Sequence, residues 1–182
     1  MDRVIKADLY RYGRLTGFKG FIKGWMDPGF RYTFFFRKVS RNKKLNLSGI
    51  FFRLLKRRYS YKYGYQINND AQIGEGFYIF HRGTIIIGPV KIGSNCTVSH
   101  NVIIGRSYKD GKIGRPTIGD KVWIGSGAHI VGDIKIGSNV MVAPNSLVNF
   151  DVPDNSIVIS NKCNIIRKDD PTKYYITDIL GE

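Results

Sequence analysis

The sequence predicts a β-helix, a solenoid of short parallel strands, behind a helical and basic N-terminal extension. Aliphatic residues recur every six positions in the C-terminal two thirds, and a small or β-branched residue follows four places after each. A helix would place apolar residues three or four apart, and an exposed strand would alternate. A six-residue period indicates a short strand and a corner in each hexad, with three hexads to a coil. The longest run is Ile118, Ile124, Ile130, Ile136, Val142 and Val148, followed four places on by Val122, Ala128, Ile134, Val140, Ser146 and Val152.

The extension, residues 1–66, has its own composition. It contains 17 of the 29 Lys and Arg residues and three Asp, a net charge of +14, whereas residues 67–182 have 12 basic and 11 acidic residues. We expect helices over residues 3–24, 30–38 and 50–58, with a turn at residues 27–29. These helices either cap the open end of the solenoid or lie on an anionic membrane surface. Basic and aromatic residues also occur in nucleic-acid-binding proteins, but no recognition motif accompanies them, so we expect no nucleic acid partner.

Two interruptions of the period mark the candidate functional edge of the solenoid, which we assign to residues 67–160. Ile79 and Ile86 are seven residues apart, and the extra residue follows His81. A second interruption, of fourteen residues, ends at Ile118. We expect residues 106–117, which are polar and glycine-rich, to leave a corner as a loop. Loops held on a rigid scaffold often carry binding groups.

Two histidines are expected to stack. With three hexads to a coil, the third hexads begin at Ile79, Val98 and Ile118, so His81 and His100 lie two places after aligned residues in adjacent coils. Neighbouring strands are ~4.8 Å apart, which would place one imidazole above the other. Two solvated surface histidines are the simpler interpretation, but the adjacent insertion and loop favour a catalytic pair. A third histidine, at position 129, shares no column with them and is interpreted as a surface residue.

Features of the whole chain favour the cytoplasm. No stretch approaches the 18 or more apolar residues of a membrane span, and the charged N-terminus lacks an apolar signal core. Two cysteines, Cys96 at an inward repeat position and Cys163 in the C-terminal tail (residues 161–182), suggest a reducing compartment rather than a disulfide framework.

The repeats, with the segments FHRGTIIIG (residues 80–88) and VSHNVIIG (residues 98–105), resemble the left-handed β-helix hexapeptide acyltransferases. The resemblance covers roughly residues 60–165. It implies a left-handed coil, a homotrimer and acetyl-CoA as co-substrate, without a metal. Two branches are similar: bacterial serine O-acetyltransferase, and the short O-acetyltransferases of colanic acid, capsule and exopolysaccharide synthesis.

In both branches the histidine that stands where His81 stands is the general base. A neutral histidine with a pKa near ~6.5 is suited to accept the proton of an attacking hydroxyl. His100 either orients His81, binds the acceptor or acts across a subunit boundary. Because Cys96 is expected to point inward, no residue is placed to carry a covalent acetyl group, and we expect direct attack on the thioester.

Three positions where the serine branch binds its acceptor differ here. Its aspartate fifteen residues before the histidine is Gln66, its aspartate just before the histidine is Phe80, and its Arg-His-Pro loop motif becomes Gly-Arg-Pro around Arg115. That branch also has a long helical N-terminal domain, whereas about 66 residues precede the repeats here. We therefore expect a sugar hydroxyl, either free or carried on a lipid, to be preferred over L-serine as the acceptor, and serine O-acetyltransferase is the alternative function.

The resemblance also places coenzyme A in a groove between neighbouring solenoids. The positions that match its binding residues are Gly105, Arg106, Ser107, Gly125, Ser126, Gly127, Pro144 and Asn145, with Lys162 toward the 3′-phosphate. Two other classes share the solenoid. A γ-class carbonic anhydrase-like enzyme would need three zinc-binding histidines, and a non-catalytic scaffold would need neither His81 nor the loop.

Overall fold

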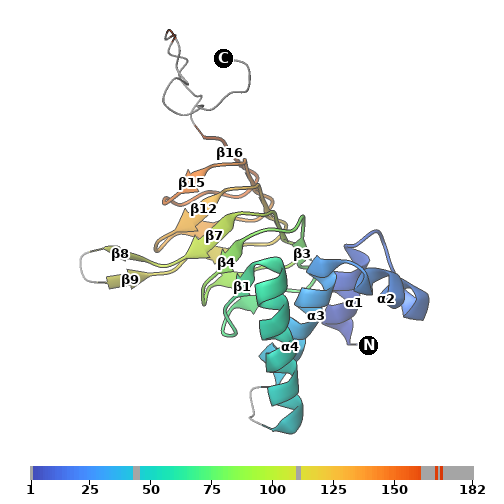
Figure 1. Ribbon diagram of the computed structural model, residues 1–182. Helices are drawn as coiled ribbons and strands as arrows, with labels where there is room; N and C mark the ends of the chain where they lie inside the picture. Colours follow the sequence, from blue (N-terminus) through green and yellow to red (C-terminus); the bar gives the residue numbers. More distant parts are fainter. Residues whose placement is uncertain (1, 43–45, 110–111, 161–166, 168, 170–182) are drawn as a thin grey trace, which may run out of the picture.

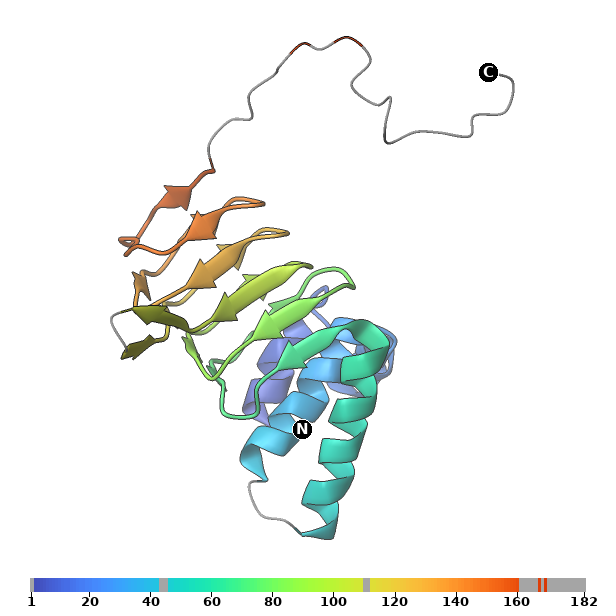
Figure 2. The same ribbon diagram turned by 60° about the vertical axis from the view of Figure 1, so that its left-hand side comes forward.

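The computed structural model describes residues 2–42, 46–109, 112–160, 167 and 169. A layer of helices lies at one end of a stack of β-coils (Figure 1). A second view shows the coils stacked one on another, with a hairpin leaving their side (Figure 2). The predicted fold class, a hexapeptide β-solenoid with short N-terminal helices, is confirmed. Lys162, the tail residue predicted to meet coenzyme A, lies outside the described residues.

Four helices precede the solenoid. Gly13 (φ 91°) and Arg14 (φ 59°) have left-handed backbone conformations. These conformations split the single helix predicted over residues 3–24, because a right-handed helix cannot continue through them. None of the helices in the described residues is long and apolar enough to cross a membrane. The helices are α1 (Arg3–Tyr10), α2 (Gly17–Trp25), α3 (Pro28–Arg41) and α4 (Leu47–Tyr63).

The sequence Asp27-Pro28-Gly29, predicted as a turn, is the start of α3. Asp27 Oδ1 accepts hydrogen bonds from the backbone N–H groups of Gly29 (2.7 Å) and Phe30 (3.2 Å). Pro28 is the first helical residue, where its missing N–H leaves no bond unmade. An aspartate in this capping position stabilises a helix by about 1 kcal/mol. The cap also fixes the place of the Asp27 carboxylate.

Each of the first four coils contributes one short strand to each of three parallel sheets, and the last coil contributes a strand to the first and third sheets. The first sheet contains β1 (Tyr65–Ile67), β4 (Ile85–Ile87), β7 (Val102–Gly105), β12 (His129–Val131) and β15 (Leu147–Val148). The second contains β2 (Gln72–Ile73), β5 (Lys91–Ile92), β10 (Thr117–Ile118) and β13 (Lys135–Ile136). The third contains β3 (Tyr78–Ile79), β6 (Thr97–Val98), β11 (Trp123–Ile124), β14 (Met141–Val142) and β16 (Ile157–Val158). The predicted loop forms an antiparallel hairpin of β8 (Ser107–Lys109) and β9 (Lys112–Gly114).

The core is the interior of the coils. The aliphatic residue that ends most strands is buried, and so is the residue four places after it. This burial confirms the inward positions predicted from the repeat. Burying one such side chain stabilises the fold by about 1.5–3 kcal/mol. The predicted residues that follow the longest run, from Val122 to Val152, are all buried.

The predicted inward orientation of Ile86 is wrong. Ile86 is 37 % exposed, whereas its neighbours Ile85 and Ile87 are buried. Ile87 pairs with Ile104 in the next coil. Successive residues of a strand point to opposite faces, so a one-residue error in register moves the side chain from the core to the surface. The corner after β3 therefore holds two extra residues rather than one.

The predicted column assignment after the hairpin is also wrong. Ile118 pairs with Ile92 in the second sheet, and Ile124 rather than Ile118 aligns with Val98 in the third. The hairpin does not take the place of a hexad. After β7 in the first sheet, the chain passes through the hairpin and continues directly into β10 in the second sheet. A count of fourteen residues cannot distinguish a missing hexad from an inserted hairpin, so only the strand pairing settles the column.

A buried ion pair joins the helices to the first coil. Arg37 Nε lies 2.8 Å from Asp8 Oδ2. Arg37 also donates to the carbonyl of Gly74 (2.6 Å), and Asp8 Oδ1 accepts from the N–H of Phe77 (2.9 Å). Tyr32 and Phe36 of α3 pack in the same core cluster as Ile67 of the first coil. The helices therefore cover the open end of the solenoid.

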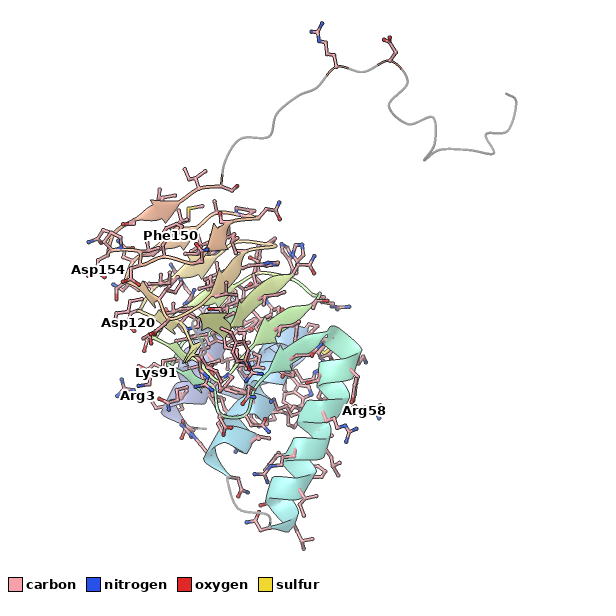
Figure 3. The ribbon with its side chains drawn as sticks, turned by 90° about the vertical axis from the view of Figure 1, so that its left-hand side faces the viewer. Arg3, Arg58, Lys91, Asp120, Phe150 and Asp154 are labelled. Carbon is pink, nitrogen blue, oxygen red and sulfur yellow. The ribbon has the colours of Figure 1, made fainter. Side chains whose placement is uncertain are left out.

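Along another edge of the solenoid, carboxylates satisfy the corners. Asp120 Oδ1 accepts from the N–H of Ser94, and Asp154 Oδ1 from the N–H of Ser138, both at 2.6 Å. Figure 3 shows the two aspartates on the same side of the stack. Each carboxylate reaches the coil before its own, so these bonds hold neighbouring coils together.

Candidate active site

His81 follows β3 at the corner between the third and first sheets. Its backbone is left-handed (φ 72°), which is uncommon for a residue with a side chain. The phenol of Tyr65 donates to the carbonyl oxygen of His81 (3.1 Å) and holds this conformation. The ring of Phe80 lies against the imidazole, with 3.8 Å between the ring centroids. The His81 side chain is exposed, so solvent or a substrate reaches it.

The predicted stacking of two histidines is confirmed. The imidazole centroids of His81 and His100 are 5.7 Å apart, at an interplanar angle of 70°. Ile79 and Val98, two places before them, are register partners. Gly83 makes the close approach feasible, because a Cβ at this position would lie 3.0 Å from the Cβ of His100. The extra residues of the corner after β3 thus accompany the placement of His81 beside His100.

His100 has a partner in the following coil. Its Nδ1 lies 3.2 Å from Ser126 Oγ, and its carbonyl oxygen accepts from the N–H of Gly127 (3.0 Å). Ser126 is among the residues predicted to bind the cofactor, and in the described structure it orients the His100 ring. The sequence contained no signal for this contact, because the column of Ser126 depends on the corrected strand pairing.

A cavity of about 300 Å³ opens beside His81. Besides His81 and its neighbours Phe80 and Arg82, it is lined by Asp27 at the start of α3 and by Tyr78. Burial, with a smaller contribution from Asp27, raises the pKa of Tyr78. Its phenol therefore stays protonated at neutral pH and can donate a hydrogen bond. The cavity combines a base, a carboxylate and neutral hydrogen-bond donors.

Asp27, like Tyr78, is a cavity residue that sequence reasoning missed. Its Asp-Pro-Gly context signalled only a turn, and 53 residues separate it from His81 in the chain. The side chain uses Oδ1 for the helix cap. No hydrogen bond is recorded for Oδ2 among the described residues, so that oxygen is available to a ligand in the cavity.

The three predicted acceptor residues do not meet within one chain. Phe80 lines the His81 cavity. Gln66 lines a different groove, of about 770 Å³, between α4 and the first sheet. Arg115 follows β9 and is exposed beside the hairpin. Within one chain the structure therefore does not bring Gln66 and Arg115 to the cavity that Phe80 lines.

The predicted coenzyme A residues fall at two corners of the coil. One group stacks above His100, where Gly127 and Asn145 continue the column. The other begins the hairpin at the corner between the first and second sheets, where the Arg106 guanidinium lies over the Tyr108 ring, 5.3 Å from its centroid. The group above His100 is Gly125, Ser126, Gly127, Pro144 and Asn145, and the hairpin group is Gly105, Arg106 and Ser107.

The glycines in these two groups have different reasons to be small. A Cβ at Gly125 would meet the backbone nitrogen of Pro144 at 2.6 Å, so glycine is required there by the packing of adjacent coils. A Cβ at Gly105 would meet nothing within 4 Å. Open space therefore adjoins Gly105, at the corner remote from the histidines.

Among the described residues, no group of three His, Cys, Asp or Glu side chains lies together as a metal site would require.

Comparison with known proteins supports the fold. Residues 115–149 match the family described as bacterial transferase hexapeptide (six repeats). Serine acetyltransferase of Helicobacter pylori is 33% identical over 107 residues, 58% of this chain and 63% of that protein. The chain thus spans about three fifths of the length of this relative.

Solved structures agree with this comparison. Serine acetyltransferase of Neisseria gonorrhoeae superposes with a TM-score of 0.72 at 29% identity, covering 94% of this chain and 68% of that one. Its complex with serine gives a TM-score of 0.71 at 29% identity, covering 87% and 66%. The chain has the hexapeptide-repeat left-handed β-helix acyltransferase fold. These relatives are named serine acetyltransferase, which we expected only as the alternative function.

Proposed function

We propose that the protein is an acetyl-CoA-dependent O-acetyltransferase in which His81 is the general base. The observation that carries this proposal is the cavity of about 300 Å³ that His81 shares with Asp27 and Tyr78. The His100 ring lies 5.7 Å from the His81 ring and contacts Ser126 Oγ in the following coil. A hydroxyl in this cavity would lie next to an exposed imidazole, as general-base catalysis requires.

The reaction follows from the chemistry of the lining. The acceptor hydroxyl attacks the thioester carbonyl, and His81 accepts its proton as the C–O bond forms. The protonated Tyr78 phenol is a hydrogen-bond donor for the oxyanion of the tetrahedral intermediate. The C–S bond then breaks, and the thiolate of coenzyme A takes the proton from His81 as it leaves. No covalent acetyl-enzyme is needed.

L-Serine is the first candidate acceptor. Its ammonium group would pair with Asp27 Oδ2, while Oδ1 continues to cap α3. A carboxylate next to an ammonium group makes a charge-assisted hydrogen bond, roughly twice as strong as a neutral one. The relatives named serine acetyltransferase support the same acceptor.

Turnover measurements test this acceptor directly. We expect release of coenzyme A from acetyl-CoA with millimolar L-serine, and we expect Asp27→Asn to raise KM for serine at least tenfold. Asparagine also caps helices, so this variant should keep its thermal stability. Serine turnover without any effect of Asp27→Asn would contradict the role of Asp27, and a lack of turnover with every acceptor would contradict the acetyltransferase proposal.

A sugar hydroxyl is the second candidate, favoured by Phe80. This side chain is 39 % exposed at the mouth of the cavity and packs against His81. An aromatic face beside the base suits the apolar face of a sugar ring. The same assay with nucleotide-linked and lipid-linked sugars separates the two candidates. Activity on a sugar that Phe80→Ala abolishes, with none on L-serine, would establish the sugar as acceptor.

We further propose that the active enzyme is a homotrimer in the cytoplasm. The two groups of predicted coenzyme A residues lie at different corners of one chain, so a neighbouring solenoid would bring the Arg106 corner beside the His81 corner. Co-expression of His81→Asn chains with Arg106→Ala chains should restore part of the activity that each variant lacks alone. A monomer by light scattering, or no restoration, would contradict the shared site.

A further inference from the structure

The outer face of α2 exposes large apolar side chains in a row. Phe18, Ile22 and Met26 follow one another at four-residue steps and are 78%, 52% and 73% exposed. Residues spaced by four lie on one face of a helix. Lys19 and Lys23, one place after Phe18 and Ile22, form a parallel basic row on the same exposed side. We call these five residues the α2 face.

The inner side of α2 is already occupied. Phe21 packs on Phe30 and Phe34 of α3, with centroids 5.9 and 5.8 Å apart. A Cβ at Gly24 would clash with the side chain of Leu9. The apolar residues of the α2 face are therefore not needed to dock the helix on its own chain. In Figure 1, α2 lies at the outer margin of the helical layer.

An apolar groove continues from the α2 face between α1, α2 and α3. Its volume is about 690 Å³, and Phe18 lines both the groove and the face. Ile5, Phe21 and Phe34 form its apolar walls, and Lys6 and Lys38 are among its polar residues. Its acidic member, Asp2, is ion-paired with Arg41, which lowers the pKa of Asp2 to about 2. The groove thus combines apolar walls with two cationic groups, as a lipid-binding surface does.

We propose that the α2 face is a docking surface for an anionic lipid bilayer. A short helix with a row of apolar residues beside a row of lysines lies in the interface, with its apolar side among the acyl chains and its cations at the headgroups. A second copy of the chain fits less well, because an α2–α2 contact would oppose lysines with lysines. Helix α2 contains no acidic residue to pair with them.

Not every cation of the N-terminal extension can reach a bilayer. Lys56 is only 7% exposed, and its Nζ donates to the carbonyl of Ile67 and to Asn69 Oδ1, both at 2.5 Å. It therefore cannot reach a membrane surface. Residues 43–45, with two more lysines, lie outside the described residues. The α4 helix also exposes the apolar side chains of Leu47, Ile50, Phe51 and Leu54. The groove beside it, however, has Arg53, Lys56, Arg57 and several uncharged polar residues among its lining, together with apolar residues of the first coils.

The position of the α2 face has a consequence for the acceptor, which rests on the proposed function. Met26, the last residue of the face, precedes Asp27, which lines the His81 cavity. A chain seated on a bilayer through α2 would hold this cavity near the headgroups. Such a placement favours an acceptor carried on a membrane lipid.

Co-sedimentation with vesicles tests the docking surface without any need for catalysis. We expect the protein to bind phosphatidylglycerol–phosphatidylcholine vesicles at low salt and to bind pure phosphatidylcholine vesicles weakly. Lys19→Gln with Lys23→Gln should weaken binding about 25-fold, since each cation near an anionic bilayer contributes about fivefold. Phe18→Ser with Met26→Ser should abolish it. The matched controls, Lys121→Gln with Lys135→Gln and Leu47→Ser with Leu54→Ser, should leave binding unchanged.

The two tryptophans report the orientation. Trp25 lies in α2 and Trp123 lies in the solenoid. In the Trp123→Phe variant, lipids with brominated acyl chains should quench the remaining fluorescence of Trp25. In the Trp25→Phe variant, Trp123 should remain unquenched. Loss of binding in the α4 control, quenching of Trp123 alone, or α2 variants that change only the oligomeric mass would each overturn the proposal.

Discussion

The imidazoles of His81 and His100 lie 5.7 Å apart, on register-aligned coils, but their supports differ. His81 has a left-handed backbone and a hydrogen bond at its carbonyl oxygen, whereas the His100 ring is held through Nδ1 by Ser126. Left-handed residues with side chains are strained and occur where the surrounding structure over-determines them. His81 therefore bears the strain, and His100 is the better-anchored ring.

Replacing His81 should separate activity from stability. We expect His81→Gly to lower kcat by about 10²–10⁴. Its free energy of unfolding should rise by roughly 0.5 kcal/mol, because relief of the left-handed strain, about 1–2 kcal/mol, exceeds the entropic cost of glycine. The matched control is His129→Gly in the extended strand β12, which should lose stability and keep its activity. Full activity of His81→Gly would exclude His81 as the base.

Removing the Ser126 hydroxyl should lower kcat. Ser126→Ala loses the contact to His100 Nδ1, and one hydrogen bond contributes about 1 kcal/mol, so we expect kcat to fall about fivefold. Steady-state kinetics with both substrates provide the measurement. Ser138→Ala is the control, because that hydroxyl accepts only from the N–H of Asp120 on another edge. A rise in KM for acetyl-CoA with kcat unchanged would instead assign Ser126 to cofactor binding.

Breaking the buried ion pair should destabilise the junction of the helices and the solenoid. We expect Arg37→Met to lower the free energy of unfolding by about 3–5 kcal/mol, because Asp8 is left charged and buried. Urea denaturation measures the effect. The control Arg3→Met removes an exposed pair with Glu75 and should change stability by less than about 1 kcal/mol.

The same variant should respond to pH. Burial raises the pKa of Asp8, and Arg37 opposes that shift. Without Arg37 the folded state binds a proton at Asp8 more readily than the unfolded state does. The destabilisation should therefore shrink as the pH falls from 7 toward 5. A deficit that stays constant with pH would show that Asp8 is not the titrating group.

Cys96 should be chemically silent. Burial raises the pKa of its thiol to about 11, so at pH 8 its thiolate fraction is roughly 100-fold below that of an ordinary cysteine. In a Cys163→Ser background, a disulfide reagent should label Cys96 only after denaturation. Iodoacetamide treatment of the folded protein should leave activity intact. Inactivation by alkylation of Cys96 would argue for a covalent acetyl-enzyme.

Much of the fold was predictable because a hexapeptide solenoid is periodic. Each coil repeats the same local conformation, so inward positions such as Ile124 and Val142 can be counted along the chain. The stacking of His81 on His100 was also predicted by counting, because Ile79 and Val98 begin the third hexads of adjacent coils despite the extra residues that follow His81. Counting cannot assign the strand register across an interruption of the six-residue period. Ile86 and Ile118 were misplaced because an insertion shifts the register by a number of residues that its length alone does not reveal.

The amino-acid sequence by itself determined the solenoid, the projecting loop, the paired histidines and the contrast between a basic extension and a nearly neutral repeat domain. These features depend on local periodicity and composition. Long-range packing decided which residues join the histidines. The helices fold back over the first coil, the buried Asp8–Arg37 pair fixes them there, and Asp27 thereby reaches the His81 cavity. Such contacts depend on how separate elements pack, and no six-residue count contains that information.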